Sequence, residues 1–388
     1  MKNQLDQIFY ENYSYKPQYE FFAPGRVNLI GEHIDYNGGL VMPCAITMGT
    51  WLHIGKNDEN VIRFRSLNFD EQAEIPSQSS FSKTGSEWFN YPLGVINELQ
   101  KAYDWQCGGL DLLYYGNIPI GSGLSSSASI EVVTAFALNK IYNLGLDKLN
   151  LVKLCKTVEN NFIGVNSGIM DQFAVAFGEK DSAIVLNCNT LKHKIVACNL
   201  QEYSLAIINT NKHRTLADSK YNERVQECLK ALQYLQREIN INNLCDLSAE
   251  KFALHQHLIV DETLLKRASH VVKENDRVIS AAKLLAEGNL HSFGKLMYAS
   301  HQSLKELYEV SGKELDTIVD FCVSYQHVIG ARMTGAGFGG CAIALLEKGF
   351  EEDFAKHLSG YYLNKIGYYA TIYVEEIGAG PTVLKALN

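Results

Sequence analysis

Four side chains that can bind hydroxyl groups or move a proton lie within ten positions near the N-terminus. The segment APGRVNLIGEHIDYNGG, residues 23–39, carries Arg26, Glu32, His33 and Asp35 between apolar stretches. Carboxylates and imidazole accept hydrogen bonds from hydroxyls, and a polyol presents several hydroxyls close together. A solvent-exposed turn carries the same residue types, so a polyol site and a surface turn both stay open. The spacing matches no metal-binding motif such as HExxH.

A further carboxylate, Asp171, has apolar neighbours in the segment ENNFIGVNSGIMDQF, residues 159–173. A partly desolvated carboxylate can accept a proton from a substrate hydroxyl. Gly168 would allow a ligand to approach the backbone closely. An aspartate that caps a helix or forms an ion pair inside the fold fits the same pattern, and the residues alone do not separate the two.

Two glycine-rich segments have the composition of phosphate-binding turns. In PIGSGLSSSAS, residues 119–129, glycines and serines precede an apolar stretch, so N–H groups at a helix N-terminus could face an anion. This segment is neither a Walker A motif nor GxGxxG, and a capped helix after a glycine turn is the competing interpretation. The second segment, RMTGAGFGGC at 332–341, suits a tight bend or a second wall of the same ligand site.

Hydrophobic patterning predicts the elements that position these segments. A helix that is apolar on nearly every side, and therefore buried, follows Ser129. We expect strands over 27–30, 41–46, 51–54, 61–64, 183–186, 205–209, 342–346 and 370–374, and further helices over 216–239, 264–286, 290–307 and 351–358. We place a domain boundary near residue 180, which gives an N-terminal domain over 1–180 and a C-terminal domain over 181–388.

Composition excludes several classes of function. The chain has 388 residues, of which 46% are hydrophobic and 20% charged, which is typical of a folded protein. A net charge of −8 argues against a nucleic-acid partner, and no stretch is long and apolar enough to span a membrane. Nine cysteines without CxxC spacing predict thiols in a reducing compartment. We therefore expect a cytoplasmic protein.

Together these segments resemble the GHMP small-molecule kinases, and the matches span most of the chain. They are GRVNLIGEHIDYNGG at 25–39, PIGSGLSSSAS at 119–129, GVNSGIMDQF at 164–173 and RMTGAGFGGC at 332–341. The first is the most specific, because GEHxDYNGG marks the branch of this family that phosphorylates galactose; Ile34 stands where threonine is frequent. The resemblance implies an α+β fold with an N-terminal mixed-sheet domain, a C-terminal domain of antiparallel sheet plus helices, and an active site in the cleft between them.

The resemblance also implies a reaction. The family uses ATP and Mg²⁺, and this branch transfers the γ-phosphoryl group to the C1 hydroxyl of α-D-galactose, giving galactose 1-phosphate and ADP in galactose catabolism. Asp171 would take the hydroxyl proton and Arg26 would keep that carboxylate ionised. Sugar binding would fall to Glu32, His33, Asp35, Gly168 and Tyr221, and phosphate binding to Gly121, Ser122, Gly123, Leu124, Ser125, Ser126 and Ser127. Trp88 would lie near adenine, and Ser127 and Glu159 would hold Mg²⁺.

Two other functions stay open at this point. A kinase of a related sugar such as N-acetylgalactosamine would keep much of the first motif. A non-catalytic, sugar-sensing regulator is the alternative from another class. Some such relatives have lost residues of the segment 119–129, called the serine loop below, whereas Ser125, Ser126 and Ser127 are all present here. We expect a monomer whose partners are the small molecules galactose and ATP.

Overall fold

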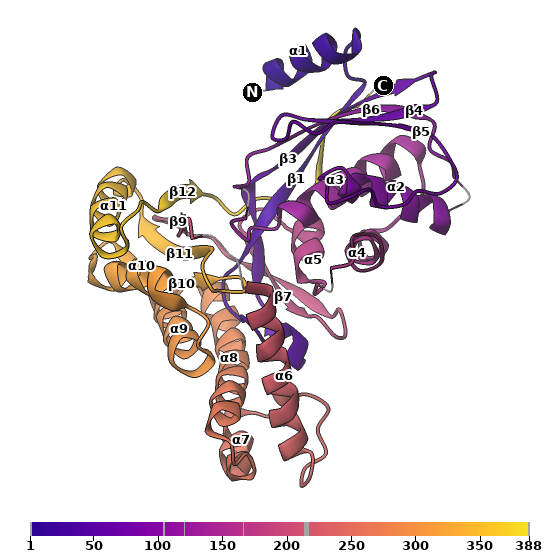
Figure 1. Ribbon diagram of the computed structural model, residues 1–388. Helices are drawn as coiled ribbons and strands as arrows, with labels where there is room; N and C mark the ends of the chain where they lie inside the picture. Colours follow the sequence, from indigo (N-terminus) through magenta and orange to yellow (C-terminus); the bar gives the residue numbers. More distant parts are fainter. Residues whose placement is uncertain (1, 104, 120, 166, 213–216, 387–388) are drawn as a thin grey trace.

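Figure 1 shows the computed structural model, which describes residues 2–103, 105–119, 121–165, 167–212 and 217–386. The helices are α1 (Lys2–Tyr13), α2 (Asn90–Ala102), α3 (Ser126–Tyr142), α4 (Lys148–Thr157), α5 (Met170–Phe177), α6 (Ala217–Leu235), α7 (Ala249–His255), α8 (Glu262–Ala286), α9 (Leu290–Ser303), α10 (Gly312–Ser324) and α11 (Glu351–Ile366). The strands are β1 (Tyr19–Asn28), β2 (Leu40–Val41), β3 (Pro43–Asn57), β4 (Val61–Ser66), β5 (Ala73–Pro76), β6 (Gly109–Gly116), β7 (Ser182–Asn187), β8 (His193–Ala197), β9 (Tyr203–Asn209), β10 (Val328–Thr334), β11 (Cys341–Glu347), β12 (Thr371–Glu375) and β13 (Thr382–Lys385).

A six-stranded mixed sheet in the order β13-β1-β3-β6-β4-β5 forms the N-terminal part. β4 runs parallel to β6, and the other neighbours are antiparallel. α3 and α5 pack against β1 and β3, while α1 also packs on β3 and lies above the sheet in Figure 1, with α2 and α3 below it. Because helices cover it, β3 is buried along most of its length. The predicted mixed sheet is confirmed.

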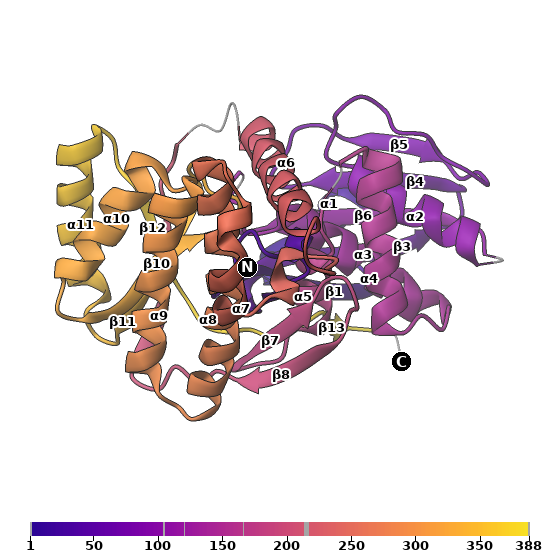
Figure 2. The same ribbon diagram turned by 90° about the horizontal axis from the view of Figure 1, so that it is seen from below.

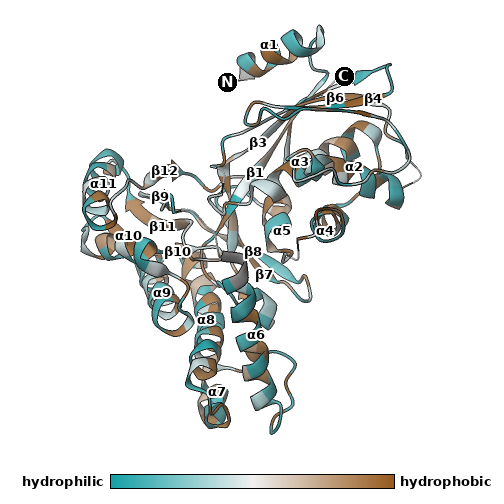
Figure 3. Cartoon of the chain, in the orientation of Figure 1, coloured by the Kyte–Doolittle hydropathy of each residue, from teal (hydrophilic) through white to brown (hydrophobic). Residues whose placement is uncertain are grey.

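A four-stranded antiparallel sheet, β10-β11-β9-β12, forms the C-terminal part. α9 and α10 pack against β10, and α8 lies beside α9, as Figure 2 shows from below. In Figure 3 the inner strand β11 is largely hydrophobic, whereas the outer helices α6 and α11 mix hydrophilic and hydrophobic residues. This contrast agrees with burial of all but the last residue of β11. The predicted antiparallel sheet with helices is confirmed.

Two segments connect these parts. β13, near the C-terminus, pairs with β1. Residues that follow β1, among them Leu29, Ile30 and Ile34, pack with the apolar side chains of the C-terminal sheet and helices. The small sheet β2-β7-β8 extends from the same region. The domain boundary near residue 180 stays a prediction.

Most predicted elements are present, with different bounds. The strand expected over 41–46 falls on the end of β2 and the start of β3, and the strand expected over 51–54 lies in the same β3, which continues through a register shift against β1 between Ala45 and Gly49. β1 ends at Asn28, so the strand expected through residue 30 is too long. The helix expected from 351 continues to Ile366 and ends at Gly367, which has φ 97°. Leu216, the expected start of another helix, lies outside the described residues.

Two further expectations concern the whole chain. No helix in the described ranges combines the length and apolar character needed to cross a membrane. All nine cysteines lie within those ranges, and none of them forms a disulfide bond, as their spacing predicts.

Candidate active site

The first polar segment begins at a β-bulge. The register of β1 against β3 shifts between Pro24 and Arg26, and a side chain on Gly25 would lie 2.8 Å from the carbonyl oxygen of Leu124. The absence of that side chain lets the loop before α3 pack directly on β1, where the N–H of Arg26 donates to the Leu124 oxygen at 3.2 Å. Bulges re-aim side chains, and this one brings Arg26 to the serine loop.

Arg26 holds Asp171 through two hydrogen bonds. Its Nε donates to Oδ1 at 3.0 Å and its Nη2 to Oδ2 at 2.6 Å. Its Nη1 donates to the carbonyl oxygen of Gly123 at 2.6 Å, and the hydroxyl of Ser125 donates to Oδ2 of Asp171 at 2.5 Å. A bidentate, charge-assisted pair fixes orientation as well as charge. The carboxylate is thus oriented beside the serine loop by three donors.

The serine loop presents the N-terminus of α3. Gly121 and Gly123 have φ values of 71° and 78°, in the region that glycine enters without strain. Ser125, the residue before α3, has φ 65°, and its side chain makes no capping hydrogen bond. The expected serine cap is therefore absent at this position, because that hydroxyl donates to Asp171 instead. First-turn N–H groups without a side-chain cap are the donors that bind anions at a helix N-terminus.

Asp35 and Gly168 lie against one another. A side chain on Gly168 would stand 3.0 Å from Oδ2 of Asp35, and both residues line a pocket of about 360 Å³ together with Lys156. Burial raises the pKa of Asp35 to about 6, and the carboxylates of Glu32 and Asp171 act in the same direction. Two acidic side chains of the first polar segment, Glu32 and Asp35, and Asp171 of α5 are therefore close enough for their charges to interact.

His33 is held in a neutral form. Its Nδ1 lies 2.9 Å from the hydroxyl of Tyr36 and its Nε2 lies 3.1 Å from the carbonyl oxygen of Ala336. Burial lowers the pKa of His33 to about 3, and His270 acts in the same direction. A carbonyl oxygen only accepts, so Nε2 carries the proton and Nδ1 accepts from Tyr36. The ring centre lies 5.5 Å from that of Tyr221, which places these two predicted sugar-binding residues side by side.

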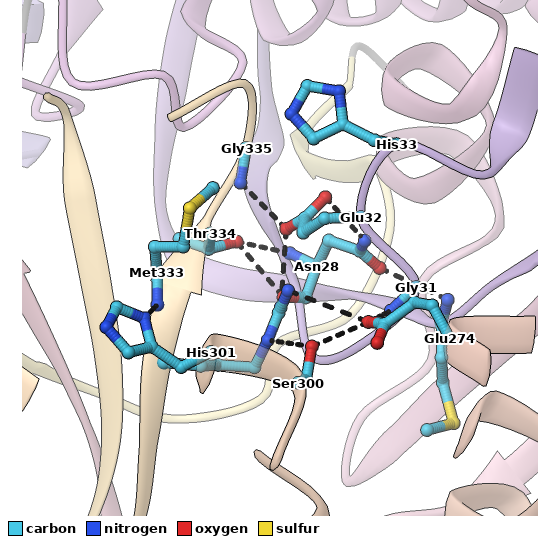
Figure 4. A network of polar contacts seen from close by, with 12 residues as sticks. Asn28, Gly31, Glu32, His33, Glu274, Ser300, His301, Met333, Thr334 and Gly335 are labelled. Carbon is cyan, nitrogen blue, oxygen red and sulfur yellow. Dashed lines mark hydrogen bonds and ion pairs between the residues drawn. The ribbon is translucent and has the colours of Figure 1, made fainter. Parts of the chain in front are cut away.

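Figure 4 shows Glu32 at the centre of a buried polar network. Its Oε1 accepts from the N–H of Gly335 at 2.7 Å and from Nη1 of Arg332 at 3.3 Å. Its Oε2 accepts from Nδ2 of Asn28 at 2.9 Å. The Arg332 guanidinium also donates to the hydroxyl of Ser300 at 3.2 Å. Glu32 therefore joins the first polar segment to the second glycine-rich segment.

The two glycine-rich segments meet. A side chain on Gly335 would lie 3.8 Å from the carbonyl oxygen of Gly123, the same oxygen that accepts from Arg26. Farther along the second segment, Gly337 has φ 78°, and a side chain there would stand 2.2 Å from the carbonyl oxygen of Val310. The second segment is thus a tight bend and also a neighbour of the serine loop.

A separate pocket of about 150 Å³ opens beside the start of α3. Phe69, Trp88, Ser126 and Ser127 are among the residues that line it. The rings of Phe69 and Trp88 are stacked with centroids 6.1 Å apart, and Nε1 of Trp88 donates to the carbonyl oxygen of Glu71 at 2.8 Å. The pocket combines a flat apolar wall with the helix N-terminus.

Ser127 and Glu159 form a pair of oxygen donors. The hydroxyl of Ser127 donates to Oε1 of Glu159 at 3.0 Å, and the hydroxyl of Ser167 donates to Oε2. Glu159 lies in the π-helical turn Val158–Ile163 that follows α4. Hydroxyl and carboxylate oxygens are the ligands that Mg²⁺ prefers in proteins.

Comparisons with known proteins identify the family. The galactokinase galactose-binding signature matches residues 7–56, the GHMP kinases N terminal domain matches 90–179, and the GHMP kinases C terminal model matches 281–360. A galactokinase of Clostridium tetani is 51% identical over 380 residues, which cover 97% of this chain and 96% of that protein. The chain belongs to the galactokinase family. A galactokinase of Streptococcus thermophilus is 48% identical over 384 residues, which cover 98% of this chain and 99% of that protein.

Solved structures agree with this membership. The crystal structure of Lactococcus lactis galactokinase complexed with galactose superposes with a TM-score of 0.92 at 45% identity and covers 99% of this chain and 100% of that one. The mevalonate kinase of Methanococcus jannaschii superposes with a TM-score of 0.71 at 22% identity, covering 92% of this chain and 98% of that one. The second likeness shows that the fold is shared across GHMP kinases.

The structure brings several of the predicted site residues into contact with one another. Arg26 and Asp171 meet at the serine loop, and Ser127 meets Glu159. Glu32 faces the second glycine-rich segment. Ile120 and Asn166, which lie within the quoted motifs, are outside the described residues.

Several residues of the site are not predicted by the sequence. Arg332 belongs to the motif RMTGAGFGGC and could therefore have been named as a candidate. Nothing in the sequence indicates that Arg332 pairs with Glu32. Phe69, Lys156 and Glu274 lie in segments without a motif; Oε1 of Glu274 accepts from the N–H of Gly31 at 2.9 Å. A charged residue on an amphipathic helix has the same pattern whether it faces solvent or a pocket, so the sequence carried no signal for Lys156 or Glu274.

Proposed function

We propose that this chain is a galactokinase that transfers the γ-phosphoryl group of ATP to the C1 hydroxyl of α-D-galactose, giving galactose 1-phosphate and ADP. The observation that carries the proposal is the Asp171 carboxylate, which Arg26 and Ser125 orient beside an uncapped helix N-terminus. This geometry sets a proton acceptor next to an anion site, which is the arrangement that phosphoryl transfer to an alcohol needs.

Asp171 accepts the C1 hydroxyl proton in this mechanism. Its side chain is 32% exposed, so a hydroxyl can reach it. Arg26 orients the carboxylate through two hydrogen bonds and offsets negative charge as the phosphoryl group moves. Because phosphoryl transfer depends mainly on positioning and charge stabilisation, the rigid clamp on Asp171 is the central contribution of the protein.

The sugar occupies the space beside Asp35, Gly168, His33 and Tyr221 in this proposal. Short acceptors on different segments can each bind a hydroxyl, and a site built this way rejects an analogue that lacks one. Glu32 can take part as well. An ionised carboxylate has about four lone-pair sites, and three donors from the described residues use Glu32, so one acceptor position is left for a hydroxyl.

The nucleotide lies across the serine loop, with its phosphates on residues 121–127 and its adenine in the pocket that Trp88 and Phe69 line. Ser127 and Glu159 fit Mg²⁺, because both offer oxygen donors and their atoms already contact one another. When bound, Mg²⁺ supplies positive charge to the phosphate oxygens. Ser125 has a different task here, since its hydroxyl orients Asp171.

The proposal includes a monomer as the active species, because the residues assigned above to galactose, ATP and Mg²⁺ complete one site within a single chain. The nine cysteines without a disulfide bond support a reducing compartment such as the cytoplasm.

ADP release with a panel of monosaccharides tests the function. With ATP and Mg²⁺ we expect kcat/KM to be highest for galactose, and lower for N-acetylgalactosamine and glucose. A higher kcat/KM for N-acetylgalactosamine would instead assign the related sugar kinase. A folded sample that binds galactose but releases no ADP would assign the sugar-sensing regulator. The Asp171→Asn variant serves as the blank for contaminating kinase activity.

A further inference from the structure

Two fully buried polar side chains, Glu131 and Gln172, meet behind the proposed active site. Glu131 lies in the second turn of α3, the helix that begins at the serine loop. Gln172 lies in the first turn of α5, directly after Asp171. Their contact therefore joins the phosphate-binding helix to the helix that carries the proposed base.

The hydrogen bonding of this pair is incomplete when Glu131 is ionised. Nε2 of Gln172 donates to Oε2 of Glu131 at 3.3 Å. The second oxygen of each group, Oε1 of Glu131 and Oε1 of Gln172, is buried and accepts no hydrogen bond from the described residues. A buried polar atom without a partner destabilises the folded state. One proton on the carboxyl group would serve both oxygens at once.

We propose that Glu131 is a positioning residue for phosphoryl transfer, held as a neutral carboxylic acid that forms a cyclic pair with the Gln172 amide. The acid O–H donates to Oε1 of Gln172, and the other carboxyl oxygen accepts from Nε2. The inference rests on the kinase function proposed above, since its consequence is the placement of Asp171.

The surroundings of Glu131 favour this neutral form. Burial raises the pKa of Glu131 well above its ordinary value, and the carboxylates of Glu159 and Asp171 raise it further, while the hydrogen bond from Gln172 and the charge of Lys156 act in the opposite direction. Tyr91 also faces this group. An ionised Glu131 would add a third negative charge beside two carboxylates that the mechanism uses as anions.

The pair matters because α5 is short. It has eight residues and begins one position before Asp171, so few helical hydrogen bonds hold its first turn. The link from Gln172 to α3 sets the distance between Asp171 and the serine loop. A misplacement of about 1 Å can lower a catalytic rate by about 10²-fold.

Three substitutions on α3 test the pair. Glu131→Gln keeps one donor and one acceptor toward Gln172, and we expect it to retain at least about a third of the wild-type kcat. Glu131→Leu keeps the bulk and removes both hydrogen bonds, and we expect kcat to fall about 10²-fold with much smaller changes in KM for galactose and ATP. Thr134→Val is the matched control, because it removes a buried hydrogen bond between α3 and Tyr114 away from α5. It should lower the melting temperature and leave kcat close to that of the wild type.

An infrared spectrum gives a readout without substrate. The wild type should show a carbonyl band of a protonated carboxylic acid that is absent in Glu131→Gln. That readout separates the two proposals, because it does not depend on which sugar is phosphorylated.

Three results would overturn the inference. They are the absence of that band, a Glu131→Gln variant as slow as Glu131→Leu, and a folded Glu131→Leu variant with wild-type kcat. Where Glu131→Leu does not fold, the exchanged pair Glu131→Gln with Gln172→Glu replaces it. We expect the exchanged pair to recover kcat relative to Gln172→Glu alone, and no recovery would contradict the cyclic pair.

Discussion

Two arginine–carboxylate pairs lie in the same site and differ in what surrounds them. In the Arg26–Asp171 pair the side chains are 7% and 32% exposed, and the third donor is a serine hydroxyl. In the Arg332–Glu32 pair the side chains are 0% and 4% exposed, and the other donors are a backbone N–H and an asparagine. The first pair can meet a substrate. The second binds one segment of the chain to another.

The comparison shows that residue type does not separate a chemical role from a structural one. Both pairs stand in motifs that carry the family resemblance, and both combine an arginine with an acid. Burial and the nature of the remaining donors make the difference. Taking a charge pair out of water is costly, so a buried pair stabilises the fold only while both partners are present. A partly exposed pair loses less hydration on folding and leaves its carboxylate accessible to a substrate.

The largest expected effect is on turnover, in the exposed pair. Asp171→Asn keeps the shape and a hydrogen bond to Arg26 but removes the proton acceptor, so kcat should fall by about 10² to 10⁴-fold. Binding of galactose should stay measurable by calorimetry, and the melting temperature should change less than in the Arg332 variant below. Turnover near that of the wild type would show that Asp171 is not the base.

The next effect is on stability, in the buried pair. Arg332→Met leaves the Glu32 carboxylate buried without its cation, which should lower the free energy of unfolding by about 3–5 kcal/mol. Urea denaturation measures this change. Lys101→Met is the control, because its ion pair with Glu98 is largely exposed on the lysine side and should cost about 1 kcal/mol or less. An equal decrease in the free energy of unfolding in the two variants would show that burial does not make the Arg332–Glu32 pair more important for stability than an exposed pair.

The next expected effect is a pH dependence of stability at Asp35, which belongs to neither arginine–carboxylate pair. The pKa of this carboxyl is raised from 3.8 to about 6, so the folded state favours its protonated form. The associated stability is present below about pH 4 and is lost as pH rises through about 6. Asp35→Asn cannot ionise. The difference in free energy of unfolding between this variant and the wild type should therefore shift in favour of the variant by up to about 3 kcal/mol when pH rises from 4 to 7. Urea denaturation at several pH values measures the difference, and a constant difference would contradict this assignment.

The smallest expected effect is at Ser125, the third donor to Asp171. Ser125→Ala removes one hydrogen bond to the carboxylate and leaves the two from Arg26, so kcat should fall about tenfold. Steady-state kinetics measure this change. Ser129→Ala is the control, since its hydroxyl bonds to the carbonyl oxygen of Ala23 and not to Asp171. A larger loss of kcat in the control would reverse the assignment.

Local patterns were enough to predict much of the fold. The apolar residues after Ser129 predict the buried helix α3, and the alternation of strands and helices predicts β7, β9, β11 and β12 within a few residues. These elements depend on side chains close in sequence. The mixed sheet and the antiparallel sheet followed from the family resemblance rather than from periodicity.

Long-range contacts of the site could not be predicted in the same way. The link between Ser125 and Asp171 needs α3 and α5 to be placed first, and the burial of Glu131 is visible only once α5 covers it. The residue type of Glu32 is typical of a ligand-binding site. Only the position of Arg332 shows that Glu32 also connects two segments of the fold. The sequence therefore predicts many of the site residues, whereas the packing determines which of them contact one another and adds residues such as Phe69 and Lys156.

The pairing of β13 with β1 has a consequence for synthesis of the chain. Glu20 on β1 lies opposite Lys385 on β13, so one edge of β1 stays open until the ribosome has synthesised β13, more than 350 residues later. At about 5–20 residues per second, that interval is roughly 20 to 70 seconds. An open strand edge pairs readily with other chains. A nascent chain thus keeps an unprotected edge on β1, the strand that leads into Glu32, His33 and Asp35, and slow translation or loss of residues 382–385 would extend the period in which it can aggregate.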